Sequence, residues 1–268
     1  MIKRGSAVRF DRLAEGGRNE PLRVVVEMFD DGSEREVFLK PSGRPEVGFE
    51  GMANEVVAAC IAGHVGLPVC EPILVELQQE WINSIPQPAI QHMLFNSCPV
   101  AFGSTSAGDG WRRWTPDDRV IGDRRATALG IFAFDAFTEN ADRLVGNPNL
   151  LVKGDAIRMI DHELCFRIRL LLLPPPRPWQ QGNLDRLVRP GADAHVFGTL
   201  LKGDRYIDVP ALRPAWSSLS DEVLDEYGAW IPEEWAPAAG AVADALTHIR
   251  HVRDNIDECL TEVKRALT

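Results

Sequence analysis

Residues 140–149 read Asn140-Ala141-Asp142-Arg143-Leu144-Val145-Gly146-Asn147-Pro148-Asn149, and the fold assignment starts from them. The sequence before them predicts a helix over residues 124–138. Two short apolar runs follow, 149–152 and 157–160, and Lys153-Gly154-Asp155 joins them like a hairpin turn. The stretch is therefore interpreted as a polar loop between a helix and a β-hairpin.

The side chains of this loop have the chemistry of a catalytic site. Asp142 has a carboxylate that can accept a proton from a hydroxyl. Asn147, five positions later, offers a hard oxygen ligand for Mg²⁺. Asp161 follows the hairpin, so we expect its carboxylate to enter the same cavity as a second metal ligand. An ordinary Asn- and Asp-rich turn is the alternative, but the order of helix, loop, hairpin and Ile160-Asp161 is more specific than a turn.

A lysine and a glutamate near the N-terminus match this chemistry. Residues 22–27 and 36–40 read as the strands of a hairpin, with an Asp-Gly turn between them. Lys40 closes the second strand, and Glu55 lies fifteen residues later on a predicted helix over residues 50–63. A strand lysine paired with a helical glutamate is how kinases direct an ammonium group at nucleotide phosphates. The alternative is a solvated lysine and an unrelated surface glutamate.

The order of elements predicts the fold class. Strands dominate the beginning of the chain, a hairpin lies in the middle, and the last third, beyond Ser217, reads as helices. Residues 103–110 are rich in glycine and serine and are interpreted as a loop or a connection between two lobes. We expect an α+β protein with a small β-rich lobe and a larger helical lobe.

Composition and charge exclude some classes of function. The formal net charge is −10, which argues against a nucleic acid as a direct partner, because such binders usually present a basic surface. The N-terminal residues lack the apolar stretch of a signal peptide. The run Leu170–Leu173 is far too short to cross a bilayer. A cytoplasmic protein without a membrane partner is therefore expected.

Beyond these patterns, the sequence resembles the HipA-like kinases, in particular their short single-domain branch. The resemblance implies a bilobal protein-kinase-like fold, related to that of lipid kinases, in one domain over residues 1–268. Its N-lobe would span about 1–103 and its C-lobe about 104–268. The similarity covers roughly residues 7–166 and rests on these motifs: Val37-Phe38-Leu39-Lys40, Met52-Ala53-Asn54-Glu55, Gly66-Leu67-Pro68, Phe102-Gly103-Ser104, Asn140-Ala141-Asp142-Arg143, Asn147-Pro148-Asn149 and Ile160-Asp161-His162.

The resemblance also implies cofactors and residue roles. ATP and Mg²⁺ would be the cofactors, and a protein or a small molecule would be the phosphoacceptor. The implied roles are catalysis by Asp142, Lys40 and Glu55, nucleotide contacts by Lys40, Gly16, Gly17 and Phe102, and Mg²⁺ binding by Asn147 and Asp161.

Three features depart from the family pattern. Leu144 stands where lipid kinases and many family members have a histidine after the Asp-Arg pair. The expected phosphate loop has only Gly16-Gly17 and no G-x-G-x-x-G pattern. The chain is also shorter than the toxin kinases that give the family its name, so an antitoxin-like partner is not inferred.

The leading hypothesis is transfer of the γ-phosphoryl group of ATP to a hydroxyl, on protein Ser or Thr rather than on a small molecule. One alternative is a nucleotide-binding module with little catalysis that acts through partner contacts. Another keeps the fold but transfers AMP or phosphorylates a small molecule.

Overall fold

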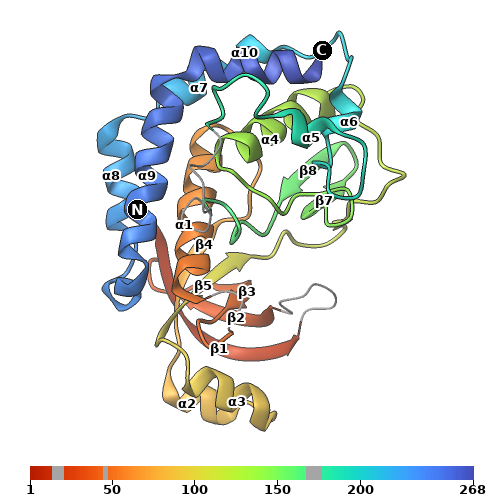
Figure 1. Cartoon of the computed structure of the whole chain (residues 1–268). Helices are drawn as coiled ribbons and strands as arrows, with labels where there is room; N and C mark the ends of the chain where they lie inside the picture. The colour runs from red at the N-terminus through yellow and green to blue at the C-terminus, as the bar shows by residue number, and fades with distance from the viewer. Residues whose placement is uncertain (14–20, 45–47, 167–176) are drawn as a thin grey trace.

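The computed structural model describes residues 1–13, 21–44, 48–166 and 177–268. Its first part is a closed β-barrel with the strand order β1-β2-β3-β5-β4 (Figure 1). All barrel neighbours pair antiparallel except β1 and β4, which pair parallel and close the barrel. The barrel strands are β1 (Lys3–Leu13), β2 (Leu22–Met28), β3 (Glu34–Lys40), β4 (Pro72–Glu76) and β5 (Val100–Thr105).

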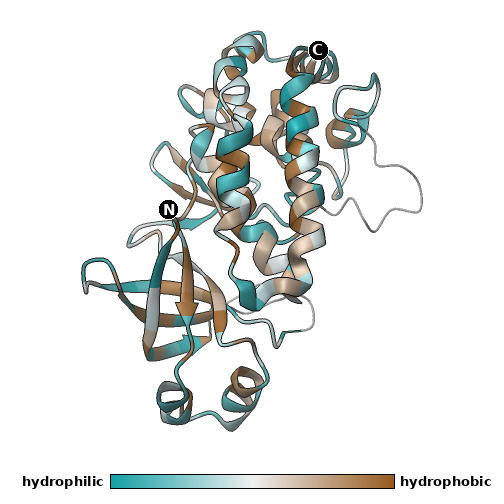
Figure 2. Cartoon of the chain, turned by 90° about the vertical axis from the view of Figure 1, so that its left-hand side faces the viewer, coloured by the Kyte–Doolittle hydropathy of each residue, from teal (hydrophilic) through white to brown (hydrophobic). Residues whose placement is uncertain are grey.

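The first hairpin forms as predicted. The register of β2 and β3 runs from Leu22 opposite Leu39 to Glu27 opposite Glu34. Gly32 in the turn has a φ of 68°, which glycine adopts at little steric cost. The barrel strands carry both hydrophobic and hydrophilic residues (Figure 2), and most residues of β2 are buried. The smaller hydrophobic core is formed by buried residues of the barrel strands and of the short helices α2 (Gln79–Ser84) and α3 (Pro88–Phe95).

The loop expected over residues 103–110 begins later than predicted. Gly103, Ser104 and Thr105 belong to β5, which pairs with β3 and β4. A Cβ atom on Gly103 would lie 2.6 Å from Val37 Cγ1 and 2.8 Å from Val75 Cγ2. The glycine thus allows close approach between strands and does not mark a turn.

Helix α1 (Gly48–His64) connects the barrel to the helical part of the molecule. It contacts β4 and β5 on one side and helices α8 and α9 on the other, so its residues are buried on nearly every face. The helix ends at His64 and is followed by Gly66, whose φ is 77°, and Leu67 N donates to Ala62 O at 2.8 Å. A left-handed glycine after the last turn is a common helix end.

The middle of the chain also matches the prediction. Helix α4 (Arg124–Phe137) precedes the loop, and strands β7 (Leu150–Lys153) and β8 (Ala156–Met159) form the hairpin after it. Strand β6 (Arg112–Arg113) extends this hairpin to a three-stranded sheet. The larger hydrophobic core lies between α1, α4, this sheet and the C-terminal helices.

The last part of the described chain is helical, as expected from the sequence. In Figure 1 these helices lie beside α1 and at the end of the molecule opposite to α2 and α3. No helix in the described ranges is both long and apolar enough to span a membrane. The elements are α5 (Asp185–Val188), α6 (Gly198–Leu201), η2 (Val209–Leu212), α7 (Arg213–Ser217), α8 (Asp221–Ala229), η3 (Glu233–Ala238), α9 (Ala239–Asp254) and α10 (Ile256–Leu267).

Candidate active site

Lys40 and Glu55 lie together where the barrel meets helix α1. Lys40 is the last residue of β3, and Glu55 lies in the second turn of α1. Lys40 Nζ donates to Glu55 Oε1 at 2.5 Å. Their exposed fractions are 7% and 2%, so the pair is shielded from water. The structure thus brings together the strand lysine and the helical glutamate that the sequence singles out.

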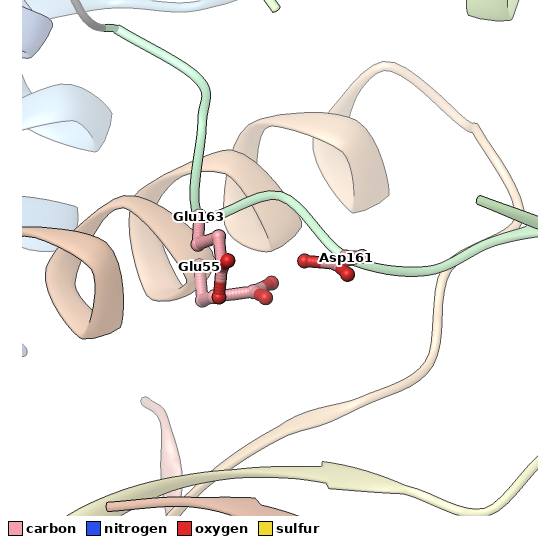
Figure 3. Close-up of side chains that lie close together, drawn as sticks. All are labelled: Glu55, Asp161 and Glu163. Atoms are coloured by element: carbon pink, nitrogen blue, oxygen red, sulfur yellow. The ribbon is translucent and has the colours of Figure 1, made fainter. Parts of the chain in front are cut away.

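Two acidic residues from beyond β8 reach the same ammonium group. Lys40 Nζ lies 2.7 Å from Asp161 Oδ1 and 3.0 Å from Glu163 Oε2. Asp161 has a φ of 63°, a left-handed conformation that Asp adopts more readily than most residues. Figure 3 shows the side chains of Glu55, Asp161 and Glu163 gathered in one space, from α1 and from the segment after β8. Sequence reasoning assigned no role to Glu163.

The cluster strongly perturbs the pKa values of Lys40, Glu55 and Glu163. Burial alone would lower the pKa of Lys40, but Glu55, Asp161 and Glu163 outweigh it and raise that pKa. Burial alone would raise the pKa of Glu55, but the Lys40 ammonium and a hydrogen bond with His162 lower it to about 2. Burial raises the pKa of Glu163 to about 7, because the attraction of Lys40 only partly offsets it.

Two neighbouring side chains orient this cluster. His162 Nδ1 lies 3.3 Å from Glu55 Oε2, so this histidine contacts the second oxygen of the glutamate. Asn54 Nδ2 donates to the backbone oxygen of Glu163 at 3.1 Å. Both His162 and Asn54 are buried. The segment after β8 is therefore attached to α1 at two points.

The polar loop holds the carboxylate of Asp142 from two sides. Asp142 Oδ2 accepts hydrogen bonds from Asn147 Nδ2 at 2.9 Å and from Asn149 Nδ2 at 2.8 Å. The backbone N–H of Asp142 donates to Asn140 Oδ1 at 3.0 Å. The loop thus fixes its acidic residue through its own asparagines. Asn149 lies in the quoted motif, but its sequence position alone indicated no role for it.

Arg143 connects the loop to the segment that presents Asp161. Its Nη1 donates to the backbone oxygens of Asn149 at 2.5 Å and Ile160 at 3.2 Å. Its Nε donates to Asp135 Oδ2 on helix α4 at 2.6 Å. Arg143 and Asp135 are fully buried, and burying an ion pair is favourable only when further hydrogen bonds satisfy it. Sequence reasoning missed Asp135, although a carboxylate on the apolar face of a predicted helix was a signal.

Three further residues were predicted to contact the nucleotide, and the structure describes one of them, Phe102. Phe102 lies opposite Lys40 in the β3–β5 register. Its side chain is 2% exposed and belongs to the larger hydrophobic core. Gly16 and Gly17 lie outside the residues that the structure describes.

The donor atoms near Lys40 fit a hard cation. Carboxylate oxygens of Glu55, Asp161 and Glu163 lie within 4.8 Å of one another, and oxygen ligands are those that Mg²⁺ prefers. The Asp161 side chain is 30% exposed, whereas those of Glu55 and Glu163 are 3% and 8% exposed. Asp161 is therefore the member of the cluster that solvent reaches most easily.

Comparison with known proteins identifies the family. A family model described as HipA-like kinase matches residues 32–171, more than half of the 268 residues. The crystal structure of a Helicobacter pylori proinflammatory kinase, CtkA, is similar over 99% of this chain and 98% of that one, with a TM-score of 0.50 and 13% sequence identity. At this identity the similarity shows a shared mixed α+β fold. No curated protein sequence matches significantly. The resemblance noted from the motifs is thus confirmed, and the chain belongs to the HipA-like kinase family.

Proposed function

We propose that this chain is a kinase that uses ATP and Mg²⁺ to transfer the γ-phosphoryl group to a hydroxyl of protein Ser or Thr. The observation that carries the proposal is the position of Lys40 Nζ, 2.5 Å from Glu55 and 2.7 Å from Asp161. Phosphoryl transfer needs a fixed cation for the phosphates next to a metal-binding carboxylate. Three elements far apart in the sequence supply these groups to one point.

Under this proposal Asn147 and Asp161 hold Mg²⁺. The amide nitrogen of Asn147 is engaged by Asp142, so the amide oxygen is the end that is available to a cation. Bound Mg²⁺ would neutralise phosphate charge that develops during transfer. Lys40, kept protonated by its raised pKa, would bind the nucleotide phosphates, and Glu55 would hold Lys40 in place.

Asp142 is the proposed catalytic base. Its carboxylate accepts two amide hydrogen bonds on one oxygen, Oδ2, which fixes its orientation while the other oxygen can face an acceptor hydroxyl. A positioned base of this kind contributes about 10² to 10⁴ in rate. The asparagines of the loop thus have two functions, because Asn147 and Asn149 orient the base and Asn147 also offers a metal ligand.

The proposed arrangement of the domain is bilobal, with an N-lobe of about 1–103 and a C-lobe of about 104–268. Its support is the presence of two separate hydrophobic cores, one associated with the barrel and one with the helices. Lys40 lies at the end of a barrel strand, whereas Asp161 follows the sheet of the helical part. The nucleotide would bind between them, and Phe102, Gly16 and Gly17 remain the further contacts that the family resemblance implies.

Transfer of labelled γ-phosphate to the protein itself or to a cell lysate tests the proposal. Asp142→Asn and Asp161→Asn are each expected to lower the rate by about 10²-fold or more. Asp155→Asn is the matched control, because Asp155 is exposed in the β7–β8 turn. Removal of Mg²⁺ with a chelator should also abolish transfer. Unchanged rates in the Asp142 and Asp161 variants would contradict the assigned roles.

Two alternatives share this site. Leu144, in place of the usual histidine, favours a nucleotide-binding module with weak catalysis, and calorimetric binding of ATP without any transfer would support it. AMP transfer is the other alternative, and the intact mass of a modified acceptor protein separates AMP from phosphate. Phosphorylation of a small molecule would leave all proteins in the lysate unlabelled.

A further inference from the structure

A segment far from the family motifs pairs with the backbone of the polar loop. His195 lies outside residues 32–171, the part that the family model matches. Val145 N donates to Ala194 O at 2.9 Å, and Val196 N donates to Arg143 O at 3.0 Å. Leu144 and His195 thus form an antiparallel bridge. The loop that carries Asp142 is therefore supported along its backbone by residues 194–196.

The imidazole of His195 has one defined tautomer. The backbone N–H of Phe197 donates to Nδ1 at 3.1 Å, so Nδ1 is the acceptor and Nε2 carries the proton. Nε2 lies 2.9 Å from Asp135 Oδ2 and donates to it. The residue is 1% exposed, and burial lowers its pKa. His195 is thus a neutral hydrogen-bond donor to a buried carboxylate.

This donor completes a chain of contacts that reaches both acidic residues of the site. Asp135 Oδ2 also accepts from Arg143 Nε at 2.6 Å, and Asp135 Oδ1 accepts from Asn140 Nδ2 at 2.7 Å. Arg143 in turn holds the backbone oxygens of Asn149 and Ile160. Asn149 binds the Asp142 carboxylate, and Ile160 immediately precedes Asp161.

We propose that His195 is a positioning residue: through Asp135 and Arg143 it sets the relative placement of the Asp142 loop and Asp161. This rests on the proposed function, in which both acidic residues act on one nucleotide. Small displacements of reacting groups are costly, since a misplacement of about 1 Å can lower a rate by about 10²-fold. Leu144 leaves the loop without a histidine of its own, and His195 supplies an imidazole from a distant segment.

A packing role is the competing explanation. The His195 ring makes an edge contact with Phe132 at 5.1 Å and a tilted contact with Phe197 at 5.9 Å. If packing alone mattered, an apolar side chain of similar size would replace it without affecting turnover. The two explanations therefore predict different turnover for a variant that lacks the Nε2 donor but keeps the volume of the side chain.

The test compares His195→Gln with His195→Met. Glutamine and methionine have similar shapes, but only glutamine has an N–H donor near the position of Nε2. The matched control is His248→Met, because His248 is also a buried histidine that contacts helix α4, through Nε2 and Phe137 O at 2.8 Å. The measurements are kcat, KM for ATP, the melting temperature and hydrogen exchange of residues 140–149.

We expect His195→Met to lower kcat by about 10- to 100-fold, with KM for ATP changed less than about threefold and faster exchange in residues 140–149. His195→Gln should restore kcat to within about threefold of the wild type. His248→Met should lower the melting temperature without a comparable loss of kcat. If His195→Met does not fold, His195→Asn replaces it, because its shorter amide does not reach Asp135.

Equal losses of kcat in His195→Met and His248→Met at equal losses of melting temperature would overturn the proposal. So would failure of His195→Gln to recover kcat and slow exchange. If the wild-type protein transfers no phosphate at all, the proposed function fails, and the exchange data still decide whether His195 orders residues 140–149.

Discussion

Replacing Lys40 with methionine removes an ammonium group that lies 2.5 Å from Glu55, 2.7 Å from Asp161 and 3.0 Å from Glu163. Methionine keeps most of the volume but takes the ammonium away from the buried carboxylate of Glu55. Removing one partner of a buried ion pair costs about 3–5 kcal/mol. Lys40→Met is therefore expected to lower the free energy of unfolding by about this amount near pH 8.

A control is available in the same barrel. Lys3 Nζ lies 3.1 Å from Glu71 Oε1, but these side chains are 33% and 41% exposed. Exposed pairs contribute only about 0–1 kcal/mol, because water screens them. Lys3→Met thus makes the same chemical change without the burial, and its loss of stability should be several-fold smaller.

The pH dependence gives a second check on the same variant. In the wild type Glu55 has a pKa of about 2, below its ordinary value of 4.5. It is therefore ionised in the folded and unfolded states between pH 5 and 8. Without Lys40, burial raises the folded pKa above 4.5, so the folded state binds a proton more tightly than the unfolded state. The stability lost to Lys40→Met then increases as pH rises.

Urea unfolding followed by tryptophan fluorescence measures these differences near pH 5 and near pH 8. The loss should be smaller near pH 5 by at least about 1 kcal/mol, since one pKa unit corresponds to about 1.4 kcal/mol. A loss no larger than that of Lys3→Met, or a larger loss near pH 5, would refute the assignment of Lys40 as the buried counter-charge.

Two further predictions concern the surroundings of the site. An alanine Cβ at Gly198 would lie 1.9 Å from Leu187 O, so Gly198→Ala should destabilise the protein by about 1–3 kcal/mol in urea unfolding. Gly63→Ala, where nothing lies within 4 Å of the added atom, should instead be neutral or stabilising by up to about 1 kcal/mol. Burial raises the pKa of Glu139 from 4.5 to about 7 despite its ion pair with Arg186. Its ionisation therefore costs stability as pH rises through this range, and Glu139→Gln should be more stable than the wild type near pH 8, by up to about 3 kcal/mol. The two proteins should be equally stable near pH 4.5, and a Glu139→Gln variant with no gain at the higher pH would contradict this.

Local patterns in the sequence predicted many elements and the order of the site residues. The Asp31-Gly32 turn between β-branched runs indicated the β2–β3 hairpin, and the apolar runs around Gly154 indicated the β7–β8 hairpin. These predictions are confirmed because turn chemistry and side-chain alternation act between residues that are close in the chain. The helices α2 and α3 were missed, and so was the strand role of Gly103, which depends on its approach to Val37 and Val75.

The sequence by itself determined the family and the residue types on which phosphoryl transfer depends: an ammonium after a strand, a helical glutamate and an acidic loop before a hairpin. Only the tertiary structure decided that Glu163 joins this cluster and that Asp135 and His195 support the loop. The physical reason is that a buried carboxylate or imidazole is stable only beside a polar or charged partner. Glu163 finds Lys40, and His195 finds Asp135, in segments that are distant along the chain, and a linear sequence contains no distances across the fold.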